Sequence, residues 1–402
     1  MELKVKFLFQ LLLILLPLHC FAQENKNNNF EIYGQVVTDA GYNFNSIDPD
    51  WFDMMRPSKL PSYKDQYGTD GNVFFSVRQS KLGIKTNTQT PLGILKTQFD
   101  FDLVGFGKDA GQTTFHVVNA YGQLGKIGAG QTASAFMDLD VFPVALDYWG
   151  PLSRVFFLNL QLRYVAIEKQ DQKLIIALEK PGGTADGGDY TNSIELQNVK
   201  PVFRFPNLTA QYRRTADWGY IQIAGLLKSI KWKDADTSAF DLSGKTAGWG
   251  FNVGSVINAS NKIKFKLQGE YGKAIENYIA DVTPDIGLKS GNDQQPLQGT
   301  ALPVWAFFAF TEIKWNAKLQ SSVGYSMETI QNSNLQSANA FKKGQYGLFN
   351  LRYYPVSNVL AGIEYQYGRR DNFSDGFHST CNKIQLQLKI SFSHKMKLPS
   401  GE

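Results

Sequence analysis

Cysteine and long apolar runs are scarce in this sequence, and each scarcity excludes a class of protein. The 402 residues include only two cysteines, too few for a disulfide scaffold. The mean hydropathy is −0.26, and only one long apolar run occurs, whereas each span of a helical membrane protein needs about 20 apolar residues. Apolar residues make up 43% of the chain and aromatic residues 13%, too much for a disordered protein. Soluble globular proteins and β-barrels remain, because alternation hides a barrel's apolar residues from hydropathy scans.

Sequence motifs for catalysis, metals and nucleic acid are also missing. The chain has no G-x-S-x-G, H-E-x-x-H, phosphate-binding or paired-cysteine motif, so we expect neither an enzyme nor a cofactor nor a metal site. The formal net charge is +5, without a Lys/Arg cluster that would indicate nucleic-acid binding. His116 is more simply a polar lumenal residue than a metal ligand, and residues 182–189 are more simply a flexible loop than a calcium site. His378 next to Ser379 is weak support for a barrel lipase.

The first 22 residues have the pattern of a signal peptide that is cleaved on secretion. Residues 1–6 carry two lysines, residues 7–18 are apolar except for Gln10, and small residues stand at positions 20 and 22 before the cleavage site. The alternative is a lipoprotein signal that ends at Cys20, which His19 fits poorly. The mature chain, residues 23–402, then keeps one cysteine, Cys381, and is expected to form a single domain.

Apolar and polar residues alternate along most of the mature chain, which is typical of β-strands with two different faces. In residues 383–392, for example, isoleucine, leucine and phenylalanine alternate with lysine, glutamine and serine. No segment sustains the period of a capped amphipathic helix. We expect about sixteen strands, at residues 31–43, 73–86, 94–104, 113–124, 126–132, 155–168, 173–179, 207–216, 219–232, 247–257, 262–272, 304–315, 318–328, 344–354, 359–369 and 382–392.

Short and long connections alternate between these segments. A sandwich has no reason to place every long loop at one end, whereas a transmembrane barrel has short periplasmic turns and long extracellular loops. Closure of the sheet also satisfies the backbone groups that lipid cannot. Aromatic residues near strand ends, among them Trp232, Trp249 and Trp305, are expected to form girdles at the membrane surfaces. The sequence therefore predicts an all-β, transmembrane antiparallel β-barrel of about 16 strands with a water-filled lumen. A soluble all-β protein is the alternative.

Two sets of residues resemble known outer-membrane channels. Residues 80–86 (SKLGIKT) and the alternating strand 96–103 that follows are similar to the general Gram-negative porins. A resemblance to the DcaP-like porins rests on FHVVNAYGQL (115–124), GQT (130–132), FMD (136–138), YWGP (148–151) and QLRY (161–164). It implies a trimeric outer-membrane channel associated with small dicarboxylates. The chain departs from the family at Lys81, where arginine is usual, and at Val118, where a basic residue is common. A tail, residues 393–402, is expected after the last strand.

The polar face of the strands is expected to line the lumen. Its basic side chains are Lys81, Lys85, Lys96, Arg163, Arg213, Lys264, Lys266, Lys314, Arg352, Lys383 and Lys389. Its acidic side chains are Asp39, Asp100, Asp102, Glu270, Glu312 and Glu364. Because basic groups outnumber acidic ones, a mild preference for anions is expected. The alternative is that these residues are only solvated and give no selectivity.

The third long loop, residues 133–154, is the candidate constriction. It contains apolar groups such as Phe136, Phe142 and Trp149, which is unusual for a loop in water, and folding into the barrel would bury them. We then expect four charged residues of the loop to face the inner-wall arginines and to set a transverse field: Asp138, Asp140, Asp147 and Arg154. The alternative is a loop that packs between subunits.

Together these patterns predict a porin in the outer membrane of a Gram-negative bacterium, exported through its cleaved signal peptide. We expect a diffusion channel for small hydrophilic solutes with a mild anion preference, to which the resemblance adds small dicarboxylates and a homotrimer. The expected partners are outer-membrane lipid and small anionic solutes, and no nucleic acid. A surface-binding or adhesion barrel without open-channel transport and a soluble secreted β-protein are the alternatives.

Overall fold

The computed structural model describes residues 28–281 and 284–397. The predicted signal peptide, residues 1–22, lies outside the described residues, as do residues 398–402 of the predicted tail.

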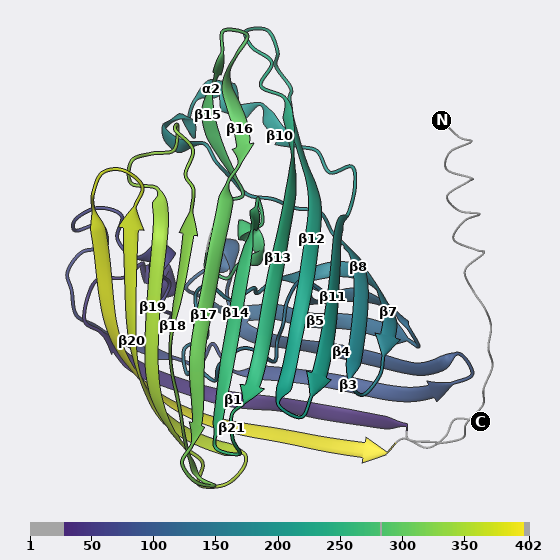
Figure 1. Cartoon of the computed structure of the whole chain (residues 1–402). Coiled ribbons are helices and arrows are strands. Elements are labelled where there is room, and N and C mark those ends of the chain that lie inside the picture. Colours follow the sequence, from purple (N-terminus) through teal and green to yellow (C-terminus); the bar gives the residue numbers. More distant parts are fainter. Residues whose placement is uncertain (1–27, 282–283, 398–402) are drawn as a thin grey trace.

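The described chain forms a closed antiparallel β-barrel of sixteen strands, as predicted (Figure 1). Two of these strands are interrupted, since β2 and β3 both pair with β1, and β10 and β11 both pair with β12. The barrel elements are β1 (Asn29–Asn43), β2 (Asn72–Ser76), β3 (Lys81–Thr90), β4 (Gly93–Val104), β5 (Thr113–Leu124), β6 (Ile127–Ala133), β7 (Leu158–Glu168), β8 (Gln172–Glu179), β10 (Val199–Pro201), β11 (Asn207–Ala216), β12 (Gly219–Asp234), β13 (Gly244–Asn258), β14 (Ile263–Lys273), β17 (Pro303–Lys314), β18 (Leu319–Ile330), β19 (Phe341–Tyr353), β20 (Val359–Asn372) and β21 (His378–Lys397).

The first and last strands close the barrel. β1 pairs with β21 along its whole length, from Asn29 opposite Lys397 to Asn43 opposite Lys383. The sequence predicted a tail from residue 393 onward, and this was wrong for residues 393–397, which belong to β21. β1 begins earlier than predicted, and its first residues supply the backbone hydrogen-bond partners that extend β21.

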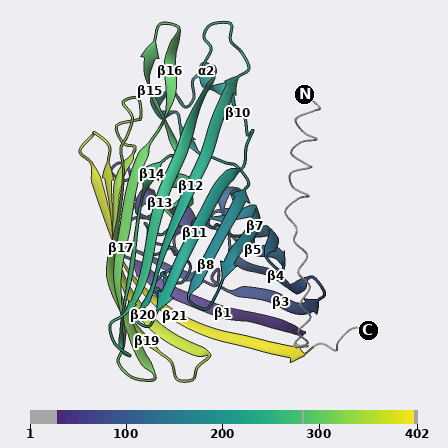
Figure 2. The same cartoon turned by 45° about the vertical axis from the view of Figure 1, so that its right-hand side comes forward.

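Long loops and short turns lie at opposite ends of the barrel. Two long loops contain elements that the sequence did not predict: β9 (Ala185–Asp186), β15 (Ile286–Asn292) and β16 (Gln295–Ala301) form a separate three-stranded sheet. This sheet and the short helix α2 (Ile194–Gln197) stand above the barrel rim in both views (Figure 2). The remaining elements are the 3-10 helices η1 (Pro49–Trp51), η2 (Pro57–Lys59), η3 (Gly107–Asp109), η4 (Gly188–Tyr190) and η5 (Glu276–Tyr278).

The two faces of the wall differ as the alternation predicts. In β21 the side chains of Ile384 and Leu386 are exposed on the outer face, whereas those of Lys383 and Gln385, which alternate with them, are buried inside. An outer surface of apolar side chains is the surface that lipid contacts in a membrane barrel. No helix of the described residues is long and apolar enough to cross a membrane.

An aromatic cluster lies on the outer face of the tall wall formed by β13, β14 and β17. Trp249 packs edge-on against Phe251 and Tyr271, with ring centroids 5.8 and 5.7 Å apart, and Tyr271 pairs across the strands with Trp305. We call these four residues the outer girdle, since such rings favour the headgroup boundary. Trp232 was also expected in a girdle, and this was wrong: it follows the inward parity of β12, and its Nε1 donates to the Leu242 carbonyl over 2.9 Å.

Candidate functional site

The loop between β6 and β7 (residues 134–157) contacts the inner wall on several sides of the barrel. The backbone N–H of Val144 donates to Glu312 of β17 over 2.8 Å, and that of Leu146 donates to Glu364 of β20 over 2.8 Å. On other strands, Lys266 of β14 donates to the loop over 2.5 Å and Asn252 of β13 does so over 2.9 Å. A segment that touches the inward-facing side chains of so many strands lies inside the cylinder.

Burial of apolar groups holds this loop inside. Phe136, Val141, Leu146 and Leu152 are almost completely shielded from solvent. Phe136, Val141 and Leu152 belong to clusters that include inward residues of the wall and of other loops. Complete burial of each such side chain stabilises the packed loop by about 1.5–3 kcal/mol relative to an exposed one.

The first long loop, residues 44–71, also folds inward, which the sequence analysis missed. Trp51, Met54 and Met55 are buried, and the Arg56 guanidinium lies between two indole rings, 4.1 Å from the ring centroid of Trp51 and 4.0 Å from that of Trp149. Arg56 Nε is 2.8 Å from an oxygen of Asp281. The apolar residues in this loop are the same signal that identified residues 133–154 and could have found it.

The structure pairs three of the four predicted loop charges with basic residues of the wall. Arg213 of β11 binds both Asp138, over 2.7 Å, and Asp140. Asp147 lies 3.8 Å from the ammonium of Lys383. Burial raises the pKa of Asp138 above its ordinary value, although Arg213 and the Tyr220 hydroxyl oppose this. Burial likewise raises the pKa of Asp147, against the effect of Lys383.

Arg154 is placed differently from the prediction. It donates to two carbonyls of its own loop, those of Tyr148 over 2.7 Å and Gly150 over 3.3 Å, and lies over the ring of Phe156 at 4.7 Å from the centroid. No carboxylate of the described residues forms an ion pair with it. Arg154 therefore does not face a wall arginine.

Many of the wall charges are covered by the inserted loops. The buried ones are Asp39, Asp100, Asp102, Lys266, Glu270, Arg352, Glu364 and Lys383. The expectation that all of these line open water was therefore wrong, because the loops occupy the space in front of them. Partly or fully exposed are Lys81, Lys85, Lys96, Arg163, Arg213, Lys264, Glu312, Lys314 and Lys389.

An open space of about 380 Å³ remains between the loop and the wall formed by β1 and β3 to β6. Lys81, Gln98 and Asn119 line it from the wall, and Tyr148 and Arg154 line it from the loop. Of these residues the sequence singled out Lys81 and Arg154, and it missed the uncharged polar groups because alternation does not rank one polar side chain above another.

The wall of this space is a fixed hydrogen-bonded network. Lys81 Nζ is 3.0 Å from Asp100, which also accepts from Tyr33 over 2.5 Å. Asp102 accepts from the Tyr148 hydroxyl over 2.7 Å and contacts His116 Nδ1 at 3.1 Å. These contacts join the loop to the wall and hold the charges at defined positions.

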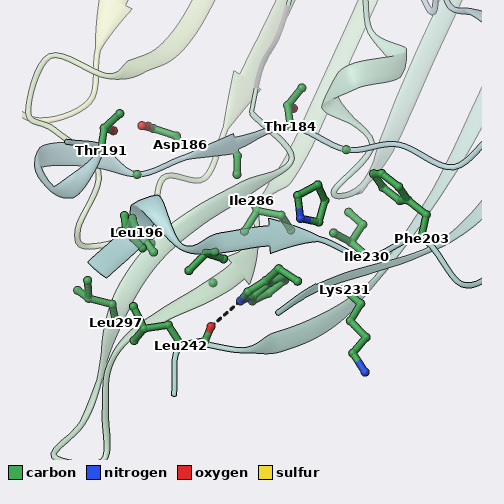
Figure 3. A pocket seen from close by; sticks show the side chains of 18 residues that line it. Thr184, Asp186, Thr191, Leu196, Phe203, Ile230, Lys231, Leu242, Ile286 and Leu297 are labelled. Atoms are coloured by element: carbon green, nitrogen blue, oxygen red, sulfur yellow. Dashed lines mark hydrogen bonds between the residues drawn. The ribbon is translucent and has the colours of Figure 1, made fainter. Parts of the chain in front are cut away.

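A second cavity, of about 330 Å³, lies above the barrel between β12 and the three-stranded sheet (Figure 3). Its lining is mostly apolar, with Ile230, Leu242 and Ile286 turned into it. Asp186 at its edge already accepts from Gly188 and Gln336. Lys231 is also among the lining residues, and its ammonium end extends away from the cavity in Figure 3. In the described part of the chain no cluster of His, Cys, Asp or Glu has the arrangement of a metal site.

The architecture agrees with a comparison against protein-family models. The model described as "DcaP outer membrane protein" matches residues 22–392. The chain belongs to this family. It is a family of outer-membrane proteins.

Solved structures share the fold of this DcaP family chain. The outer membrane channel DcaP of Acinetobacter baumannii is 21% identical, with a TM-score of 0.77 over 93% of this chain and 100% of that chain. An anion-selective porin from Comamonas acidovorans is 7% identical, with a TM-score of 0.60 over 91% of this chain and 100% of the other. OmpT of Vibrio cholerae in its trimer form is 12% identical, with a TM-score of 0.51 over 91% and 100%. No curated protein matches the sequence.

Proposed function

We propose that this channel is a passive pore for small hydrophilic solutes with a mild preference for anions. The observation that carries the proposal is the unequal covering of the wall charges. Eight of the eleven basic residues predicted to line the pore remain at least partly exposed, against one of the six acidic residues. Loop insertion thus hides more of the negative charge, and the accessible interior becomes more positive than the sequence count suggests.

The expected selectivity is weak. At about 10 Å in water one pair of charges interacts by only about 0.4 kcal/mol, so several lysines together bias solute entry by about 1–2 kcal/mol. Such an energy favours an anion and still allows its release, which conduction requires.

The test is the reversal potential in a potassium chloride gradient across a planar bilayer. Wild-type protein should pass chloride in preference to potassium, and the triple variant Lys96→Gln, Lys264→Gln, Lys314→Gln should lose most of that preference. The matched control makes the same charge change on the outer face, with Lys200→Gln, Lys231→Gln and Lys245→Gln, and should keep it. Cation preference in the wild type, or an unchanged preference in the interior variant, contradicts the proposal.

Within anions, we propose small dicarboxylates as the natural solutes. The family resemblance suggests them, and Lys81 and Arg154 bring two cationic side chains to one open space of about 380 Å³. Succinate should enter proteoliposomes faster than a neutral solute of equal size, and Lys81→Gln should reduce that advantage. Equal rates for both solutes contradict this assignment and leave the channel proposal intact.

We further propose that the mature chain begins after residue 22 and assembles as a homotrimer. The trimer form of Vibrio OmpT, which shares the fold, supports this assembly. Three equal conductance steps per insertion event in a planar bilayer are expected, and single steps only would contradict it.

A further inference from the structure

Four lysines from three neighbouring strands, β10, β12 and β13, meet on the outer face of the barrel wall. Lys231 of β12 stands directly opposite Lys245 of β13, and Lys233 of β12 stands directly opposite Lys200 of β10. Lys231 and Lys233 are two residues apart on one strand and therefore share a face. We call these four residues the lysine patch.

The lysine patch faces away from the lumen. On β12, Ile223 and Leu227 are exposed on the lipid side, and residues 231 and 233 continue the same parity. Lys228 and Ile230, of the other parity, are buried inside. In Figure 3, Lys231 accordingly extends away from the cavity that Ile230 lines.

Direct cross-strand pairs of like charge destabilise a sheet, and this wall has two of them side by side. No lysine of the patch forms an ion pair with any of the described residues. Lys200 donates only to the carbonyl of Gln197, over 2.8 Å. Hydrogen bonds with Ser243 are the main cause of the lowered pKa of Asp241, and the charge of Lys233 adds a smaller lowering, so one negative charge lies near a group of four positive ones.

The patch lies just above the outer girdle. Leu227 pairs with Trp249 of the girdle, and Lys231 pairs with Lys245 four residues further along the same two strands. Four residues span about 13 Å of strand, which is about 9 Å in height at the usual tilt of about 45°. At about 9 Å above the outer girdle, the lysine patch lies at the level of the headgroup layer of the outer leaflet, beyond the hydrocarbon.

We propose that the lysine patch binds the phosphate groups of a phosphorylated lipid headgroup in the outer leaflet. Clustered lysines are point charges that suit phosphate, and basic clusters beside a membrane bind anionic headgroups. The binding removes the repulsion between the two lysine pairs. The lipid is held by the outer wall, so this role is independent of solute selectivity in the lumen.

The test uses purified diphosphoryl lipid A as the probe and native mass spectrometry of the delipidated full-length barrel as the readout. The wild type should retain the lipid, and a quadruple variant, Lys200→Gln, Lys231→Gln, Lys233→Gln and Lys245→Gln, should need at least a tenfold higher lipid concentration. Replacement of the same four residues by arginine should keep the binding. A matched control with Lys126→Gln, Lys169→Gln, Lys262→Gln and Lys318→Gln, which removes equal charge from the turns at the opposite end, should bind as the wild type does.

Each other outcome overturns the proposal. A glutamine variant that binds like the wild type, or a wild type that binds no lipid, shows that the lysines are only solvated. Equal retention of lipid A without phosphates indicates binding through the acyl chains. Competition by inorganic phosphate at the lipid's own concentration indicates a site for a free ion instead.

Heat-modifiable electrophoretic mobility confirms that the variants fold. If the quadruple variant does not fold, the double variants Lys231→Gln with Lys245→Gln and Lys200→Gln with Lys233→Gln replace it.

Discussion

Arg213 in the barrel wall donates from Nη2 to Asp138 of the inserted loop over 2.7 Å. The Asp138 side chain is fully shielded from water and also accepts from the hydroxyl of Tyr220 at 3.0 Å. This contact fixes the first part of the loop against β11, on the side opposite to the hydrogen bonds that Glu364 accepts from Leu146 and Asp147. The loop is thus held at both sides of the lumen.

Arg213→Ala should destabilise the inserted loop. Asp138 would keep a buried charge without its cation, at a cost of about 2 kcal/mol. Equilibrium unfolding in detergent measures the loss, and the double variant with Asp138→Asn should recover most of it. Additive effects of the two substitutions would show that the residues do not interact.

Leu139→Trp should narrow the open space beside the loop and lower single-channel conductance. Leu139 is 56% exposed and lines the space of about 380 Å³. Leu162→Trp, which makes the same change at an exposed position of the outer face of β7, is the control and should leave conductance unaltered. If Leu139→Trp conducts as well as Leu162→Trp does, the conducting path does not pass Leu139.

Deletion of residues 135–150 should raise conductance at least twofold, because this loop fills much of the cross-section. Planar-bilayer recordings of the heat-modifiable, folded variant provide the measurement. Unchanged conductance would contradict the role of the loop as the constriction.

Arg56→Met should be strongly destabilising. Asp281 has no exposure and depends on Arg56, with additional hydrogen bonds from Ser58, so removal of the cation leaves a buried negative charge and costs about 3–5 kcal/mol. The double variant with Asp281→Asn should be more stable than Arg56→Met alone, as measured by thermal unfolding. If the double variant is no more stable than Arg56→Met alone, Arg56 does not compensate the buried charge of Asp281.

Glu276→Gln should stabilise the protein at pH 8 and have little effect at pH 4. Burial raises the pKa of Glu276 well above its ordinary 4.5, with Asp285 adding to the effect and Lys228 opposing it. A folded-state pKa above the unfolded one means that the native state holds more protons, so stability falls as pH rises above about 4.5. The neutral glutamine removes that loss. Melting temperatures of the wild type and the variant across this pH range measure the difference, with exposed Glu195→Gln as the control. Parallel curves for wild type and Glu276→Gln would contradict the prediction.

Alternation was sufficient to predict the wall, because a strand between lipid and water must repeat every two residues. Residues 383–392 show the point: each side chain lies on the face that the pattern assigned. Loop paths have no such period. Lys383 was correctly placed on the inner face, but nothing in its surroundings in the sequence indicated that residues 53 and 147 would cover it.

Contacts that depend on register also escape sequence reasoning. Lys200 and Lys245 belong to one patch only because β10 and β13 both pair with β12 at particular residues. Arg56 and Asp281 are likewise joined by two loops that meet inside the barrel. The unpredicted hairpin of β15 and β16 has too few apolar residues in alternation to be recognised as strands.

The pairing of β1 with β21 has a consequence for biogenesis. The first and last strands form one seam, so the barrel stays open until β21 has folded against β1. Truncation inside β21 would leave two long rows of unsatisfied amide groups facing hydrocarbon, which a bilayer does not tolerate. A chain shortened inside β21 (His378–Lys397) is therefore not expected to form a stable barrel in the membrane.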